Sequence, residues 1–278
     1  MLLFRHHADW QQYHSRFPGP LAFVPTMGAL HEGHLSLIAA ARSTGARTLC
    51  SIFVNPTQFN DPDDLLRYPR TLEADVALLE RAGCDALYHP EASDIYPAGY
   101  QMAHYNLNGL DEIMEGKSRP GHFQGVANVV HRLLTLLQPD RLYLGQKDFQ
   151  QTLVIRRMIA LEGLPVSTRV CPILREPNGL AMSSRNTRLS PAQRKEAGGL
   201  YAALQHTRNK LGNTPVPEAL QGGLELIRQL PGCSPDYLAL CHAETLEPLL
   251  TLGEPAVLLL AATLGGVRLI DNLLVPEA

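Results

Sequence analysis

Two histidines spaced three residues apart, His31 and His34, lie in the glycine-containing segment that follows the first apolar run, 21–26. They face the same side of a helix if both lie in its first turn. A helix start offers unpaired N–H groups and a positive dipole end, which favour phosphate. Two imidazoles there can donate hydrogen bonds to the charge that grows on a phosphorus atom under attack. The pair predicts phosphate chemistry, although a solvated helix face or a chance match gives the same spacing. It is not the zinc-protease motif, whose histidines stand four residues apart.

A second candidate, Lys147-Asp148, follows the run 141–146 and precedes a segment of helical period. A close pair of lysine and phosphate contributes about 4 kcal/mol at an effective dielectric near 20, before desolvation is subtracted. Asp148 can accept hydrogen bonds from ribose hydroxyls, as acidic residues do in nucleotide sites. The competing interpretation is an exposed ion pair in which Asp148 only caps the helix.

A third candidate is the tetrapeptide Ser183-Ser184-Arg185-Asn186, which follows Gly179 in a predicted loop. Its hydroxyls, N–H groups and guanidinium suit a mobile clamp that closes over a triphosphate. Ordinary linker composition is the alternative explanation.

Two polar segments in apolar surroundings, 53–59 and 119–126, complete the set of candidates. Gln58 follows a predicted strand and Gln151 lies one turn into a predicted helix, so both amides can face one cleft. Neutral amides bind hydroxyls and carboxylates without adding charge. The alternative is that Asn55-Pro56 forms a turn and Gln58 only satisfies loop backbone.

Strands and helices alternate in the part of the chain that must position these residues. The predicted strands are 21–26, 48–55, 84–90, 141–146 and 166–173, and the predicted helices are 34–44, 72–82, 124–137 and 149–162. This alternation is typical of βαβ units around a parallel sheet, which binds ligands beyond the carboxyl ends of its strands. We therefore predict an α/β protein with a Rossmann-like domain over residues 1–175.

Residues 176–278 are predicted to form a smaller α/β lid domain. Ser190 and Gln193 match a capping box, with Pro191 at the first helical position. Helical periodicity continues to about residue 230, and β-type runs follow at 237–242, 257–263 and 267–270.

The composition and the charge pattern argue against several classes of protein. The formal charge is −3, and the absence of long basic runs argues against a nucleic-acid partner. The five cysteines include no C-x-x-C pair, which indicates free thiols in a reducing compartment. The longest apolar run, 256–264, is too short to span a membrane, and the first residues do not resemble a signal peptide. A cytoplasmic protein without a membrane partner is expected.

Six segments in register resemble one family: PTMGALHEGHLSLI, FVNPTQF, YPRT, RPGHFQGVANVV, LYLGQKDFQQ and GLAMSSRN, with RLIDN near the end. The chain is similar to the pantoate–β-alanine ligases, nucleotidyltransferases with a HIGH-type motif and a KMSKS-type loop. The resemblance implies that pantoate attacks the α-phosphorus of Mg-ATP to give pantoyl adenylate and pyrophosphate. The amine of β-alanine then displaces AMP to give pantothenate. It also suggests a homodimer.

The same resemblance assigns site residues. It makes His34, His31, Lys147 and Arg185 catalytic, and it implies ATP contacts by Met27, Gly28, Ala29, Leu30, His31, Glu32, Gly33, His34, Gly145, Gln146, Lys147, Asp148, Leu174, Met182, Ser183, Ser184 and Arg185. Gln58 and Gln151 would hold pantoate against an apolar wall of Met27, Phe53, Val126, Val129 and Val130. Arg119 and His122 would lie near the entry of the amine.

The resemblance assigns a single residue to magnesium. Asp75 matches an acidic position and would contact Mg²⁺, whereas Ala74 stands where some relatives have a second carboxylate. Phosphates and water commonly supply the remaining Mg²⁺ ligands.

One rival function is that of another HIGH-motif nucleotidyltransferase acting on a different small acid or a phosphate ester, although a phosphate acceptor would favour Arg or Lys at Gln58 and Gln151. The other is an inactive nucleotide-binding regulator, which would not need all four catalytic residues.

Overall fold

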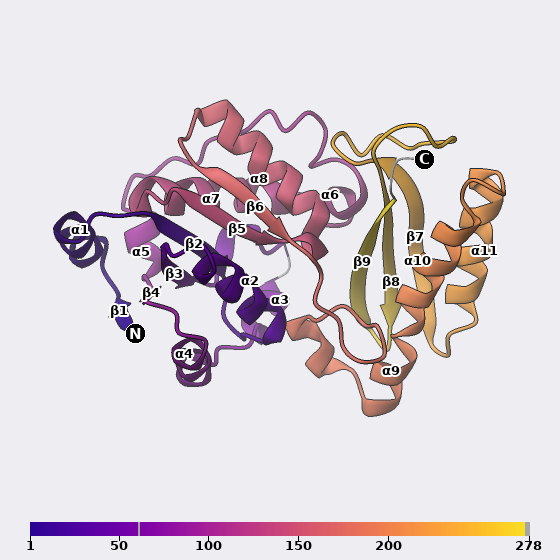
Figure 1. Ribbon diagram of the computed structural model, residues 1–278, viewed down its shortest axis with the longest axis horizontal. Helices are drawn as coiled ribbons and strands as arrows, with labels where there is room; N and C mark the ends of the chain where they lie inside the picture. The colour runs from indigo at the N-terminus through magenta and orange to yellow at the C-terminus, as the bar shows by residue number, and fades with distance from the viewer. Residues whose placement is uncertain (61, 276–278) are drawn as a thin grey trace. The chain divides into compact units, whose positions relative to one another are not determined.

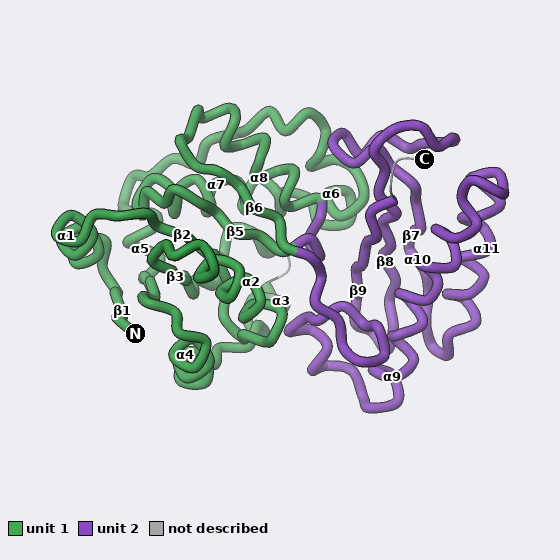
Figure 2. The backbone as a smooth tube through the Cα atoms, in the orientation of Figure 1, with its two compact units in different colours: residues 1–145, 150–171 green, residues 146–149, 172–278 purple. Residues whose placement is uncertain are grey.

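The chain divides into two compact units in the computed structural model, which describes residues 1–60 and 62–275 (Figures 1 and 2). Unit 1 comprises Met1–Gly145 and Gln150–Cys171, and unit 2 comprises Gln146–Phe149 and Pro172–Ala278. The sequence placed Lys147 in the first domain. The structure places it in unit 2, because the backbone carbonyls of Gln146 and Lys147 accept hydrogen bonds from Asn272.

A six-stranded parallel sheet with the order β1-β4-β3-β2-β5-β6 forms the centre of unit 1. This confirms the predicted fold class. Its strands are β1 (Leu2–Phe4), β2 (Leu21–Thr26), β3 (Arg47–Ile52), β4 (Ala86–Tyr88), β5 (Arg141–Gly145) and β6 (Ser167–Cys171). The sequence did not predict β1, because three residues are too few to show an alternating pattern.

The sheet is covered by helices whose apolar residues recur at helical spacing. Leu37 and Ile38 of one helix and Leu79 of another pack with Val24 and Cys50 of the strands in one core. The helices of this part of the chain are α1 (His7–Arg16), α2 (Glu32–Arg42), α3 (Pro62–Arg67), α4 (Leu72–Arg81), α5 (Ala92–Ile95), α6 (Met114–Ser118), α7 (His122–Leu137) and α8 (Phe149–Glu162). Short 3₁₀ turns, η1 (Pro56–Gln58) and η2 (Gln146–Asp148), follow β3 and β5.

Unit 2 is built on a three-stranded antiparallel sheet of order β7-β8-β9, with strands β7 (Cys233–His242), β8 (Ala256–Leu264) and β9 (Val267–Val275). Its other elements are the 3₁₀ turn η3 (Ser184–Arg188) and helices α9 (Pro191–Glu196), α10 (Gly199–Lys210) and α11 (Val216–Arg228). The predicted capping box is confirmed, since Ser190 Oγ accepts from Gln193 N and Gln193 Oε1 accepts from Ser190 N. β9 continues past Ile270, where the predicted strand ended. The prediction stopped there because Asp271 and Asn272 are polar and interrupt the apolar run.

The cysteines form no disulfide within the described residues, in agreement with free thiols. Burial raises the pKa of Cys84 and of Cys241 to about 11, and it raises the pKa of Cys50 well above its usual value. Because the thiolate is the reactive form, these three thiols are expected to resist iodoacetamide at pH 8 in the folded protein and to react after unfolding. Mass spectrometry of labelled peptides checks this, and fast native labelling of Cys84 would contradict it.

Within residues 1–60 and 62–275, no helix combines the length and the hydropathy that a membrane crossing requires.

Candidate active site

The loop between β2 and α2 takes a conformation that only particular residues allow. Gly28 and Ala29 both have positive φ, +82° and +51°. A Cβ on Gly28 would lie 3.0 Å from Asp75 Oδ2 and 3.1 Å from Ile52 Cγ2. Gly28 is therefore required both by its backbone conformation and by the close approach of Asp75.

The two histidines of the loop are fixed by the start of α2. His31 is the N-cap residue, and its Nδ1 accepts from Gly33 N at 3.1 Å. The Nδ1 of His34 accepts from His31 N at 3.3 Å, and the ring centroids lie 4.1 Å apart. Because each Nδ1 accepts a backbone hydrogen bond, each neutral ring carries its proton on Nε2. The predicted pairing of the rings is confirmed, and both present Nε2–H as a donor.

Asp75, at the start of α4, holds this loop in place. Its Oδ2 accepts from Ala29 N at 3.0 Å and from Thr71 Oγ1 at 3.2 Å, and its Oδ1 accepts from Leu30 N at 2.8 Å. The residue is only 1% exposed. Asp75 thus satisfies the backbone N–H groups of Ala29 and Leu30.

These contacts do not fit the predicted role of Asp75 as a Mg²⁺ ligand. Both carboxylate oxygens accept hydrogen bonds from the loop backbone, and the residue is 1% exposed. No group of three or more His, Cys, Asp or Glu residues able to hold a metal occurs in the part of the chain that the structure describes. A metal that arrives with its phosphates would need at most one protein carboxylate.

Replacing Asp75 by Asn tests this loop-holding role. An amide cannot accept from all three donors without turning its NH₂ toward one of them, so we expect the free energy of unfolding to fall by about 2–3 kcal/mol. The Mg²⁺ concentration for half-maximal activity should stay unchanged at fixed ATP. Urea denaturation and a Mg²⁺ titration measure the two effects, and a large rise in the Mg²⁺ requirement would restore the role of metal ligand.

Gln58 lies in a buried network at the end of β3. Its Nε2 donates to Met27 Sδ at 3.0 Å, and its Oε1 accepts from Asn55 Nδ2 at 3.2 Å. Asn55 Oδ1 accepts in turn from Tyr96 Oη at 3.0 Å. Burial raises the pKa of Tyr96, so its hydroxyl stays protonated and donates. The network orients a neutral amide that is 7% exposed.

The start of α7 packs against the same turn. His122 Nδ1 lies 2.8 Å from Gln58 O, and its Nε2 lies 3.0 Å from Arg119 Nη1. A Cβ on Gly125 would lie 2.4 Å from Thr57 O, so only glycine allows this approach. The structure therefore brings together Gln58, His122 and Arg119, which the sequence placed in two separate polar segments.

The predicted apolar wall is buried in unit 1. Four of its five members, Phe53, Val126, Val129 and Val130, are buried, and Met27 is half-buried. Gln151 is half-buried in the first turn of α8. Its neighbour Gln150 instead anchors the segment before α6, because its Nε2 donates to two backbone carbonyls there, Leu110 O and Ile113 O.

The remaining predicted residues belong to unit 2. Lys147 Nζ lies 3.3 Å from Asp148 Oδ1 within η2. The segment Leu174–Met182 folds back on itself through hydrogen bonds from Met182 N to Leu174 O and from Glu176 N to Leu180 O. Ser183 Oγ accepts from Arg185 N and caps η3. Positive groups of Lys147 and Arg185 and the Ser183 hydroxyl thus come from one compact unit.

Comparison with known proteins decides the family. The sequence model of the family described as pantoate-beta-alanine ligase matches residues 3–274. The chain belongs to this family. The pantothenate synthetase of Thermus thermophilus is 48% identical over 254 residues, which cover 91% of this chain and 92% of that protein. The pantothenate synthetase of Acidiphilium cryptum is 49% identical over 256 residues, 92% of this chain and 91% of that protein.

Solved structures of pantoate–β-alanine ligases share the fold. The crystal structure of the Thermus thermophilus pantothenate synthetase matches with a TM-score of 0.93 at 45% identity, covering 99% of both chains. A pantoate-beta-alanine ligase from Francisella tularensis, complexed with beta-gamma ATP and beta-alanine, matches with a TM-score of 0.81 at 35% identity, covering 99% of this chain and 97% of that one. The resemblance inferred from the sequence motifs is confirmed.

Sequence reasoning missed the residues that hold the site residues in place. Asn55 and Tyr96 orient Gln58, and Asn272 binds the turn that carries Lys147. Asn272 ends the RLIDN segment noted in the sequence, but the motif assigned it no role, and its partner turn lies 125 residues earlier.

Proposed function

We propose that this protein condenses pantoate with β-alanine at the expense of ATP. The observation that carries the proposal is the imidazole pair at the start of α2, with both Nδ1 atoms facing backbone N–H groups, in a chain of the pantoate–β-alanine ligase family. Two neutral donors at a helix start suit a phosphate group on which negative charge increases during attack.

In the first step, a carboxylate oxygen of pantoate attacks the α-phosphorus of Mg-ATP. The bond from that phosphorus to the oxygen shared with the β-phosphate breaks, and pyrophosphate leaves. In the second step, the β-alanine amine attacks the acyl carbon of pantoyl adenylate, AMP leaves with the C–O bond electrons, and the amine loses a proton. Forming the adenylate makes the acyl oxygen part of a good leaving group, AMP, which a free carboxylate lacks.

The residue roles are those that the family resemblance implies, and the side-chain chemistry is compatible with them. His31, His34, Lys147 and Arg185 donate to the phosphates, and Gly145, Asp148 and Met182 lie on the nucleoside side. The Gln58 amide, fixed by Asn55, hydrogen-bonds pantoate without repelling its carboxylate, and Gln151 assists it. Arg119 and His122 adjoin the Gln58 turn and guide β-alanine. The complex of the Francisella tularensis ligase with a nucleotide and β-alanine supports these ligand classes.

Three further assignments belong to the same proposal. Mg²⁺ enters as part of the Mg-ATP substrate, coordinated by phosphate and water, since Asp75 is committed to the loop. The protein works in the cytoplasm, where its free thiols stay reduced. It acts as a homodimer without nucleic acid or membrane partners.

Analysis of the products tests the reaction. With ATP, pantoate and β-alanine, AMP, pyrophosphate and pantothenate should form in equal amounts. ADP as the nucleotide product would overturn the proposal. A nucleotidyltransferase for phosphate esters would instead use a phosphorylated acceptor and ignore pantoate, and an inactive regulator would bind ATP without turnover.

A further inference from the structure

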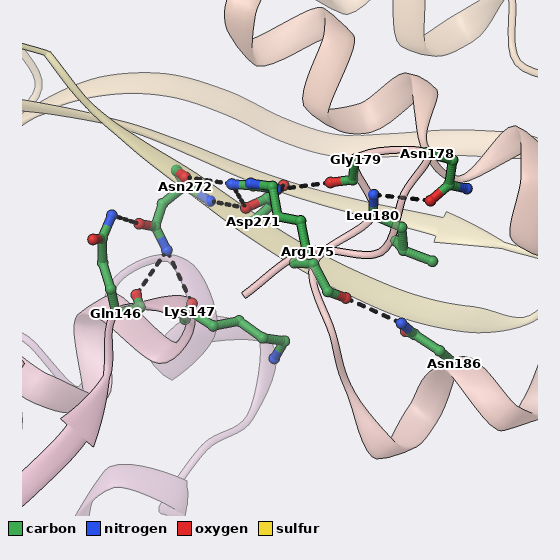
Figure 3. Close-up of polar contacts among 10 residues, drawn as sticks. Gln146, Lys147, Arg175, Asn178, Gly179, Leu180, Asn186, Asp271 and Asn272 are labelled. Atoms are coloured by element: carbon green, nitrogen blue, oxygen red, sulfur yellow. Dashed lines mark hydrogen bonds and ion pairs between the residues drawn. The ribbon is translucent and has the colours of Figure 1, made fainter. Parts of the chain in front are cut away.

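We propose that Asn272 is a positioning residue for Lys147, so that a residue of the last strand sets the place of the phosphate-binding ammonium. The inference rests on the proposed function of Lys147. It concerns groups that all lie in unit 2, shown in Figure 3.

Asn272 uses its whole side chain on the turn η2. Its Nδ2 donates to Gln146 O at 2.9 Å and to Lys147 O at 3.0 Å. Its Oδ1 accepts from Gln146 Nε2 at 3.0 Å. Three hydrogen bonds from one side chain that is 1% exposed fix the backbone from which the Lys147 side chain starts.

Asn272 is itself held by a buried ion pair. Its N–H donates to Asp271 Oδ1 at 2.7 Å, and Asp271 accepts two hydrogen bonds from Arg175, at 2.6 and 2.9 Å. The Arg175 guanidinium lies 3.6 Å from the centroid of the Tyr201 ring on α10. A bidentate pair stacked on an aromatic ring restricts Arg175 in both direction and plane.

Arg175 of the same ion pair also contacts the segment Leu174–Met182, which directly precedes the third candidate site. Arg175 Nη1 donates to Gly179 O at 3.0 Å, within the fold-back that leads to Met182. Asn186 donates to Glu176 Oε1 and Ala181 O, which fixes the other end of that segment. One polar cluster in unit 2 therefore ties the backbone of Lys147 to the backbone that precedes Ser183 (Figure 3).

Positioning matters for a lysine more than for a rigid side chain. The ammonium ends a flexible four-carbon stem, so its mean position depends on where its backbone is held. Misplacement by about 1 Å can cost on the order of 100-fold in rate. Without Asn272, the η2 carbonyls would turn to water and the turn would lose its fixed orientation.

A double-mutant cycle tests the inference. Asn272→Ala is expected to lower pantoate-dependent pyrophosphate exchange by about 10- to 100-fold, with little change in the KM for pantoate. On a Lys147→Ala background the same change should cost less than about twofold, because residues that act through one another are not additive. The dissociation constant of ATP, measured by calorimetry, provides the same cycle without turnover.

Thr207→Val is the matched control. The buried hydroxyl of Thr207 also donates to a backbone carbonyl, Ala203 O, in the same unit, and it takes no part in the hydrogen bonds described above for the Asn272–Arg175 cluster. Its effect should be equal on both backgrounds. If Asn272→Ala does not fold, Asn272→Ser, which keeps one donor, replaces it in the cycle.

The outcomes separate the two proposals. If Asn272→Ala lowers the exchange rate by the same factor with and without Lys147, the positioning role is overturned. The proposed function then stays intact. Near-normal exchange in Lys147→Ala alone refutes the role of the lysine itself.

Discussion

Alanine at Lys147 or at His34 is expected to slow the adenylation of pantoate by at least about 100-fold, the cost of losing one donor to the transition state. His34 carries its ring proton on Nε2, and Lys147 carries a full charge. Both groups interact more strongly with the phosphates as pyrophosphate leaves, so kcat should fall more than the KM for ATP rises. Initial rates of AMP formation at saturating pantoate and β-alanine measure the loss.

His242→Ala provides the control for the histidine. Its Nδ1 also accepts from backbone N–H groups, those of Glu244 and Thr245, in a turn outside the candidate site. Its rate should stay within about twofold of the parent protein, since surface substitutions have small effects. Near-normal turnover in both Lys147→Ala and His34→Ala would refute the assigned roles.

Gln58→Glu is expected to lower kcat/KM for pantoate by about 100-fold or more, because like charges about 4 Å apart repel by about 4 kcal/mol at an effective dielectric near 20. The change keeps the shape of the side chain but introduces a negative charge where we place a carboxylate substrate. The charge is poorly solvated, because the side chain is 7% exposed and its oxygen faces Asn55 Nδ2.

The KM values for the two substrates identify the cause of the loss in Gln58→Glu. The KM for ATP should change far less than the KM for pantoate, and the melting temperature checks that the fold survives. Equal losses for both substrates would indicate general disruption, and an unchanged KM for pantoate would place the acid elsewhere.

The sequence predicted the architecture well because the relevant signals are local. The strands β2 to β6 of the parallel sheet appear as short β-type runs, and α2 begins directly after His31, two residues before its predicted start at His34. The capping box at Ser190 was also predicted, since both of its partners lie within one helical turn. The family motifs added the chemistry that such patterns alone do not provide.

What the sequence did not predict depends on contacts between distant segments. Asp75 binds the loop 45 residues before it, and Asn272 binds a turn 125 residues before it. In a sequence, a carboxylate in a predicted helix gives the same pattern whether it binds a metal, a substrate or a backbone amide. For that reason the sequence could assign Asp75 to Mg²⁺ but could not show that its carboxylate binds the backbone of Ala29 and Leu30.

The most direct test of the central claim is isotope exchange of labelled pyrophosphate into ATP, with β-alanine omitted. We predict exchange that requires pantoate and falls at least about 100-fold in Lys147→Ala, because only a reversible attack of the acid on the α-phosphorus returns pyrophosphate to ATP. Exchange that proceeds equally without pantoate, or none in its presence, would contradict the account.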